Sequence, residues 1–218
     1  MRMAPRNLPN PQWPEIDYHN DNQNLPMDIP QAMVTKVRNY ATVDTNVLLN
    51  GINNMTELEE NIISSINGCD INNINQIINI FHKIEIWGGP AAGRTYTCGG
   101  GFSNNIDLNS YVDLIKTCVS IIDHSINSLE NIFEKTNNCI SKCHYFGVSF
   151  ITKHVYYWTH KSLHENALPI FDSKLSNGLY HCNPNIKQVV YYWQDMIEKA
   201  RRENVSTKSL ERTLFLCF

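Results

Sequence analysis

Apolar residues recur every three or four positions along most of this chain, the spacing that gathers them on one face of an α-helix. The pattern predicts three short helices, around Val34, Leu58 and Ile77, and then a helix of about six turns that starts at a cap on Asn109 or Ser110. Four further helices are predicted over 139–146, about 152–160, about 183–201 and about 207–216. Strand patterns are few. We therefore predict a mostly α-helical fold.

Two segments depart from the helical pattern. Residues 1–30 hold six of the nine prolines, so we expect an extended or irregular arm outside the core. Residues 87–101 are rich in glycine and predict a long loop, with a short hairpin around Tyr96 as one alternative. The expected organisation is the proline-rich arm over 1–30 and one helical domain over 31–218.

Charge is divided unevenly along the sequence. The formal net charge is −3, but residues 1–134 hold 7 basic and 15 acidic residues, whereas residues 135–218 hold 11 basic and 6 acidic ones. We therefore expect any contact with nucleic acid to lie in the last 84 residues. The acidic front part is expected to face away from phosphates or to form pocket walls.

The composition also bears on location and cofactors. No apolar run approaches the roughly 18 residues that span a bilayer, and the first residues form no secretory leader, so a soluble, cytoplasmic protein without membrane contact is expected. The seven cysteines are expected to be reduced. A zinc site at Cys139, Cys143, His144, His181 and Cys182 is a weaker alternative, because it lacks a Cys-x-x-Cys pair. We expect no metal, no cofactor and a monomer.

One stretch of the sequence carries candidate chemistry. It has the order helix, glycine turn at Gly147, and a new helix that opens with Thr152-Lys153. A loop and an apolar run containing a proline then lead to Asp172, which opens the next helix and stands 19 residues after the lysine. Over residues 144–175 this order resembles the helix-hairpin-helix DNA glycosylases, in the lysine-bearing branch typified by 8-oxoguanine DNA glycosylase.

The resemblance implies a helix-hairpin-helix glycosylase fold, with the catalytic segment over 139–180, that excises a damaged or modified base from double-stranded DNA. Lys153 would be the nucleophile, and Asp172 would stabilise the positive charge that develops on the sugar. We expect the start of a helix, together with partial burial, to lower the pKa of Lys153 and expose a neutral amine. Such an amine also implies β-elimination at the abasic product.

The remaining candidate residues are those expected to contact the extruded base or the DNA phosphates. An extruded base needs an aromatic partner, and Tyr157 lies one turn after the lysine on the same helix face. Hairpin amides and nearby cations are expected to bind phosphate. The candidates for the base pocket are Tyr157, Trp87 and Tyr156, and those for phosphate are Gly147, Ser149, Thr152, Lys142, Lys161, Lys174 and Arg94.

The sequence departs from the family pattern at four points. The second hairpin glycine is missing, and Gly147 precedes the lysine by six residues where the family has four. Tyr157 replaces a cysteine, and Lys174 replaces a histidine. The catalytic pair is therefore carried over, whereas the base specificity is not.

Two alternatives stay open. In the first, the enzyme removes hypermodified phage bases in antiviral defence. In the second, the chain is a non-catalytic helical module that keeps the hairpin for phosphate contact. His124, His154 and His160 are interpreted as surface or capping residues.

Overall fold

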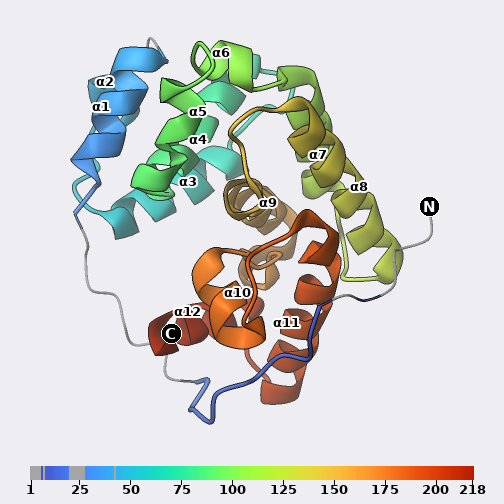
Figure 1. Cartoon of the computed structure of the whole chain (residues 1–218). Coiled ribbons are helices and arrows are strands. Elements are labelled where there is room, and N and C mark those ends of the chain that lie inside the picture. The colour runs from blue at the N-terminus through green and yellow to red at the C-terminus, as the bar shows by residue number, and fades with distance from the viewer. Residues whose placement is uncertain (1–5, 7, 20–27, 42) are drawn as a thin grey trace.

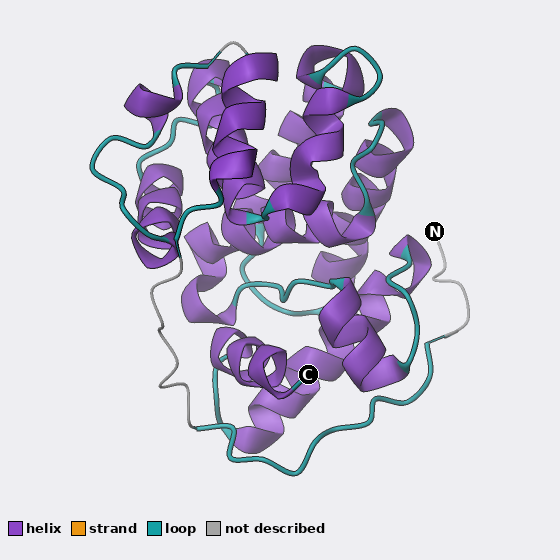
Figure 2. Ribbon diagram, turned by 60° about the vertical axis from the view of Figure 1, so that its left-hand side comes forward, coloured by secondary structure: helices purple, strands orange, loops and turns teal. Residues whose placement is uncertain are grey.

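The computed structural model describes residues 6, 8–19, 28–41 and 43–218. Most of them lie in helices, and the described residues include no strand, only an isolated antiparallel bridge between Asp28 and Asn54 (Figure 2). The mostly α-helical prediction is confirmed. In chain order the helices are α1 (Gln31–Tyr40), α2 (Thr45–Leu48), α3 (Met55–Asn67), α4 (Ile74–Trp87), α5 (Arg94–Thr97), α6 (Phe102–Asn105), α7 (Leu108–Ser120), α8 (Ile126–Lys142), α9 (Val148–Leu163), α10 (Ser173–Tyr180), α11 (Val189–Glu203) and α12 (Thr207–Cys217).

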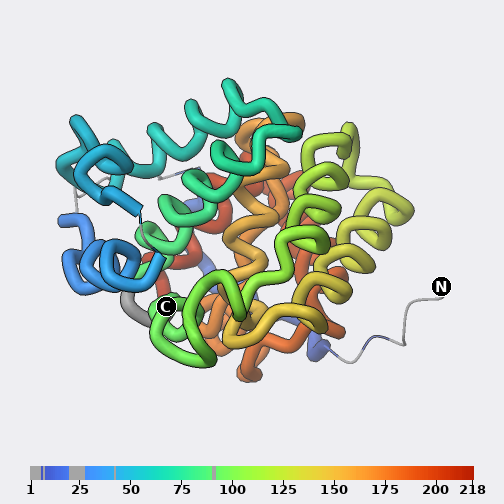
Figure 3. Tube along the Cα trace, turned by 90° about the horizontal axis from the view of Figure 1, so that it is seen from above, coloured from blue at the N-terminus to red at the C-terminus, as the bar shows by residue number. Residues whose placement is uncertain are grey.

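Helix α9 runs through the middle of the molecule. It packs against α3 and α4 on one side and against α7 and α8 on the other (Figure 3). Helices α10, α11 and α12 lie together at the end of the molecule opposite α1 and α6 (Figure 1). Because neighbours surround α9, its buried residues cover most of its circumference, and every side chain from His154 to His160 is buried.

The long helix predicted from residue 109 is wrong, because the chain forms α7 and α8 with a turn between them. Asp123 Oδ1 accepts the backbone N–H of Ser125 at 3.0 Å and the hydroxyl of Ser128 at 2.8 Å. Ser125 in turn caps α8. The apolar stripe therefore continues across the turn on a different helix.

The hairpin is also displaced from its expected position. Helix α8 extends to Lys142, and α9 begins at Val148 with Gly147 as its N-cap, four residues before the expected start. The turn between them contains Tyr145 at φ 59°, a left-handed conformation that side chains other than glycine rarely adopt. Tyr145 thus makes the sharp turn without a second glycine.

The glycine-rich segment is not an extended loop, and it forms no hairpin around Tyr96. It folds into a 3₁₀ turn (Pro90–Gly93) and the two short helices α5 and α6. The amide of the buried Asn105 donates to the carbonyls of Thr95 and Cys98 at 2.9 and 2.7 Å. These bonds satisfy the backbone of a turn that has no regular pairing of its own.

The N-terminal arm is extended as predicted, but it is not outside the core. In its described part, Leu8 and Tyr18 are 4% exposed and belong to the hydrophobic core. Gln12 N donates to the carbonyl of Leu179 in α10, and Arg6 pairs with Asp195 in α11. The arm therefore holds the two helices together from outside.

At the C-terminal end, the helix expected from Asn183 begins only at Val189, after a 3₁₀ turn (Ile186–Gln188), and ends at Glu203. The last helix matches its expected start at Thr207. None of the described helices combines the length and apolar composition needed to cross a bilayer.

Candidate functional site

The segment that leads to Asp172 is a buried, extended strap. Residues 167–171 are all buried, yet they form neither helix nor strand. Their backbone groups are instead bonded by side chains of the surrounding helices, which removes the cost of burying them unpaired. The bonds join Leu168 N to Thr159 Oγ1 (3.0 Å), Ile170 N to Glu211 Oε2 (2.8 Å), Phe171 N to Thr152 Oγ1 (3.1 Å), Trp193 Nε1 to Pro169 O (3.0 Å), Tyr192 OH to Ile170 O (2.7 Å) and Thr207 Oγ1 to Ala167 O (2.7 Å).

One of these bonds joins the two candidate catalytic residues through their neighbours. The hydroxyl of Thr152, the residue before Lys153, accepts the N–H of Phe171, the residue before Asp172. The same hydroxyl donates to the carbonyl of Val148 in the first turn of α9. The structure thus brings α9 and the start of α10 together at the two positions that the 19-residue spacing singled out.

Asp172 is the N-cap of α10, as the sequence predicts. Its Oδ1 accepts the backbone N–H groups of Lys174 and Leu175, both at 3.0 Å. Because both bonds fall on Oδ1 at a helix N-terminus, the carboxylate is fixed in orientation and lies where negative charge is favoured.

Lys153 lies in the second turn of α9 and not at its start. Burial therefore affects the pKa of Lys153 more than the helix dipole does. Its Nζ donates to the carbonyl of Gly88 at the end of α4 (3.3 Å) and lies 4.9 Å from the centre of the Phe150 ring and 5.9 Å from that of Trp87. Burial lowers the pKa of Lys153, against the opposing charges of Asp172, Glu85 and Glu211. No ion pair within 4 Å joins Lys153 to Asp172 among the described residues.

A buried polar chain that the sequence did not reveal lies beside Lys153. Glu85 Oε1 is 3.1 Å from His154 Nε2, and His154 Nδ1 is 2.7 Å from the hydroxyl of Tyr111. Trp158 Nε1 donates to that same hydroxyl at 3.2 Å. Burial lowers the pKa of His154 well below its usual range and raises that of Glu85 to about 8. The interpretation of His154 as a surface or capping residue is wrong.

The second missed residue is Glu211 of α12, which holds the strap at Ile170. Burial raises its pKa to about 8, the N–H of Ile170 opposes this shift, and the charge of Asp172 adds to it. The sequence signal for Glu85 was its position between Ile84 and Ile86 in an apolar run, whereas Glu211 carried no such signal.

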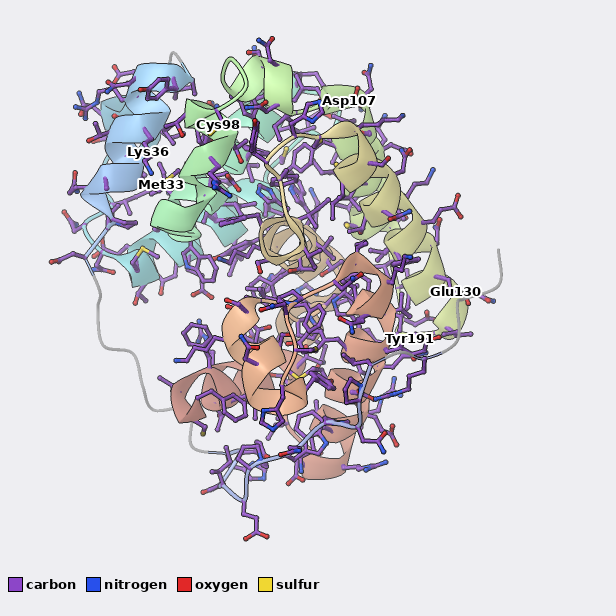
Figure 4. The ribbon with its side chains drawn as sticks, in the orientation of Figure 1. Met33, Lys36, Cys98, Asp107, Glu130 and Tyr191 are labelled. Atoms are coloured by element: carbon purple, nitrogen blue, oxygen red, sulfur yellow. The ribbon has the colours of Figure 1, made fainter. Side chains whose placement is uncertain are left out.

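An open groove of about 830 Å³ lies at the start of α9. Its wall carries Lys36 of α1, Arg94 of α5, Tyr145 and the first residues of α9, and among the described residues that line it there is no carboxylate. Lys36 lies on α1 beside α5 (Figure 4), and its Nζ would come within 2.3 Å of a Cβ at Gly93. A side chain at position 93 would therefore displace the flexible end of Lys36.

Phe150 connects the groove with the lysine. Its side chain lines the groove and also lies over Lys153 Nζ. The Phe150 ring therefore contacts both the groove and the buried amine.

The predicted phosphate contacts divide into two sets. Gly147, Ser149 and Arg94 line the groove, whereas Thr152 is fully buried and therefore inaccessible to a phosphate. The other three are lysines outside the groove wall. Lys161 Nζ donates to the carbonyls of Ile66 and Cys69 at the end of α3, Lys174 Nζ lies 4.1 Å from the centre of the Phe215 ring, and Lys142 is exposed in the last turn of α8.

The predicted base-pocket residues are packed into the core. Tyr157 is 0% and Tyr156 is 4% exposed, and their rings meet edge to face. Trp87 is half-buried and packs edge-on against Tyr157, with 5.3 Å between ring centres. Of the aromatic side chains that line the groove, Tyr145 is 51% exposed, Phe150 is half-buried and Phe146 is buried.

The suggested zinc ligands do not form a cluster. Cys139 and Cys143 lie with their Sγ atoms 3.8 Å apart, and within the described ranges no group of three or more His, Cys, Asp or Glu side chains is placed to hold a metal ion.

Comparison of the chain with protein-family models, with curated proteins and with solved structures finds no match in any of the three.

Proposed function

We propose that the protein is a DNA glycosylase that flips a damaged or modified base out of double-stranded DNA and cleaves its N-glycosidic bond. The observation that carries the proposal is the hydrogen bond from Phe171 N to Thr152 Oγ1. It joins the residue before Lys153 to the residue before Asp172, so a lysine of lowered pKa and a fixed carboxylate follow directly after two bonded positions, although they are 19 residues apart.

The two side chains divide the chemistry between them. Nζ of Lys153, as a neutral amine, attacks C1′ of the sugar while the bond from C1′ to the base nitrogen breaks and the base leaves with that electron pair. Asp172 supplies negative charge close to the sugar as positive charge develops there. The first product carries nitrogen and O4′ on C1′, and the departing base takes a proton from the nitrogen. The nitrogen lone pair then forms the C=N bond while the C1′–O4′ bond breaks and O4′ takes a proton, which opens the sugar ring. The Schiff base formed in this way permits β-elimination of the 3′ phosphate, which makes the enzyme a lyase as well.

The groove supports this proposal through charge and position. Lys36 and Arg94 face the open amides at the start of α9, an arrangement that suits a DNA phosphate. Phe150 must turn away before a sugar can reach Lys153, because its ring covers the amine. DNA binding and exposure of the nucleophile are therefore coupled through one side chain.

A second candidate is a non-catalytic helix-hairpin-helix module that binds DNA through the groove alone. It is favoured by the engagement of Lys153 Nζ with the carbonyl of Gly88, which is a complete structural role. In that case the lysine connects α4 to α9 and does not react.

The deciding experiment is borohydride trapping on a panel of duplex oligonucleotides that each contain one modified base, including oxidised bases and hypermodified phage bases. We expect a covalent protein–DNA adduct with at least one duplex, its loss in Lys153→Ala, and loss of base excision in Asp172→Asn. Lys116→Ala is the matched control, because Lys116 is an exposed lysine on α7.

Full excision by Asp172→Asn rejects the enzymatic proposal, and the same adduct yield from Lys153→Ala as from Lys116→Ala rejects Lys153 as the nucleophile. Retained binding to duplex DNA without any adduct and without release of a base supports the non-catalytic module. The base that gives the adduct also separates repair of oxidised DNA from defence against phage DNA.

A further inference from the structure

Cys139 and Cys143 form a pair of thiols that the proposed reaction does not use. Cys139 lies in the last turn of α8 and Cys143 is the C-cap of that helix. Both thiols are free, and their Sγ atoms are 3.8 Å apart. Cys139 is 0% exposed, whereas Cys143 is 8% exposed and lines the groove at the start of α9. A small molecule in the groove therefore meets Cys143 first, with a second sulfur in contact with it.

The pair comes close to the geometry of a disulfide but does not reach it while the helix is intact. The Cβ atoms of a disulfide are about 4 Å apart, whereas those of residues four apart on a regular helix are about 5–6 Å apart. The N–H of Cys143 donates to the carbonyl of Cys139 at 3.0 Å, which keeps the regular helical spacing. An S–S bond between the two residues therefore requires the last turn of α8 to change its conformation.

The turn that follows Cys143 is bonded to other helices. The N–H of His144 donates to the carbonyl of Asn105 in α6 at 2.8 Å, and the hydroxyl of Thr95 in α5 donates to the carbonyl of Tyr145 at 3.4 Å. Tyr145 itself lines the groove, as does Arg94 at the start of α5. A shift of Cys143 towards Cys139 therefore pulls on a segment that is held from the other side, and the change reaches the groove wall.

We propose that Cys139 and Cys143 are a redox-sensitive switch, in which a peroxide that enters the groove joins the two residues in a reversible disulfide and thereby alters the end of α8 and the groove wall. The thiolate of Cys143 attacks one oxygen of hydrogen peroxide, the O–O bond breaks, and the leaving hydroxide takes a proton to become water. The sulfur of Cys139 then attacks the sulfenic acid on Cys143. The S–O bond breaks, and its oxygen leaves as water with the Cys139 proton. Two thiols and one peroxide thus give one disulfide and two waters, and two electrons pass from the sulfur atoms to the peroxide.

The surroundings of the two sulfur atoms favour this order of attack. The contact with the Cys139 thiol lowers the pKa of Cys143, and the N–H of Asp107 acts in the same direction, while burial opposes both. The same contact raises the pKa of Cys139, and burial adds to this effect. Cys143 therefore ionises first, and the thiolate is the form of cysteine that attacks.

The same geometry makes the disulfide reversible. A disulfide that forces its residues away from their preferred spacing stores strain and is reduced more easily. We therefore expect a dithiol to restore both thiols and the regular last turn of α8.

The test uses Lys142, which stands between the two cysteines. The full chain is treated with hydrogen peroxide, the remaining thiols are blocked with N-ethylmaleimide, and the protein is digested with trypsin, which cleaves after Lys142. Mass spectrometry should find peptides 136–142 and 143–153 joined in one species that separates with dithiothreitol. Separate peptides after peroxide treatment overturn the proposal.

Three variants assign the roles of the sulfur atoms. Cys139→Ser should leave Cys143 as a sulfenic acid that dimedone captures, because the second thiol is missing, and Cys143→Ser should leave Cys139 reduced. Cys217→Ser is the matched control, because Cys217 is an exposed cysteine whose Sγ donates to the carbonyl of Thr213. It should give the same yield of joined peptides as the unmodified chain. Loss of the joined peptides in Cys217→Ser would show that the disulfide forms elsewhere and overturn the proposal.

Hydrogen exchange measures the change in conformation. Peptides that contain the N–H of Cys143 should exchange about tenfold faster in the oxidised chain than in the reduced one, because the bond to the Cys139 carbonyl is lost. Peroxide-treated Cys139→Ser should keep the slow exchange. Equal exchange in the oxidised and reduced chains would mean a disulfide without a switch and would overturn the proposal.

DNA binding connects the switch with the proposed function, and this connection alone rests on that function. If the groove binds duplex DNA, oxidation should weaken binding and dithiothreitol should restore it, whereas Cys143→Ser should bind equally before and after peroxide. Joined peptides and faster exchange with unchanged DNA binding would reject the groove as the DNA site and leave the switch intact. Separate peptides in a chain that binds DNA and excises a base would reject the switch and leave the function intact.

Discussion

The hydroxyl of Thr152 is expected to matter more for catalysis than for stability. Thr152→Val removes the acceptor of Phe171 N and keeps the shape of the side chain. Both residues are fully buried, so no water replaces the lost acceptor. Leaving a buried N–H unpaired costs about 1–3 kcal/mol, and for a chain of this length each kcal/mol lowers the melting temperature by about 2–4 °C.

Thr159 is the matched control for this prediction. It is also fully buried on α9, and its hydroxyl accepts the N–H of Leu168 in the same strap. Thr159→Val should therefore destabilise the fold by a similar amount. The hydroxyl of Thr159 binds a residue four positions before Asp172, whereas the hydroxyl of Thr152 binds the residue directly before Asp172.

The assay is adduct formation under single-turnover conditions, compared with thermal unfolding of the same variants. A displacement of about 1 Å between Asp172 and Lys153 lowers the rate on the order of 100-fold, so Thr152→Val should lose far more activity than Thr159→Val. Equal loss in the two variants would show that Thr152 only stabilises the fold. Full activity in Thr152→Val would refute the idea that the strap positions the carboxylate.

Two more predictions concern the groove and the strap. Arg94→Ala and Lys36→Ala should each weaken binding to duplex DNA and reduce the slope of log affinity against log salt by about one, as measured by fluorescence anisotropy; an unchanged slope excludes a phosphate contact. For Glu211, a folded pKa of about 8 above the ordinary carboxyl value means that the fold binds an extra proton, so stability is lost as pH rises from about 4.5 to 8. Urea unfolding at pH 5 and pH 8.5 measures this. The free energy of unfolding of Glu211→Gln should rise relative to that of the unmodified protein between the two pH values. The same difference in free energy at both pH values would contradict the prediction.

Local sequence patterns predicted the elements whose boundaries depend on local chemistry. The start of α10 at Asp172 follows from a side chain that caps its own helix, and the positions of α1, α3 and α4 follow from apolar spacing alone. The break between α7 and α8 was missed because the apolar stripe continues across it. The turn is made by Asp123 and Ser125, whose capping bonds compete with a helix that apolar spacing also permits.

The site was predictable only where its residues share a short stretch of sequence. Lys153 and Asp172 were singled out by a family resemblance over residues 144–175, whereas Glu85 and His154 are 69 positions apart and meet only after α4 packs against α9. A buried ionisable group looks the same in the sequence as an exposed one until its partner is known. For this reason Lys161, predicted to bind phosphate, binds carbonyl groups at the end of α3 instead.

The division of charge along the sequence does not correspond to a division in space. Lys36 and Arg94 belong to the acidic front part of the chain, yet they line the groove at the start of α9. Glu85 belongs to the same part, but it is buried and burial raises its pKa to about 8, so it adds no exposed negative charge. If the groove binds DNA as proposed, the contact combines residues of both parts of the chain. The electric field there then depends on which carboxyl groups are exposed and not on how many the sequence contains.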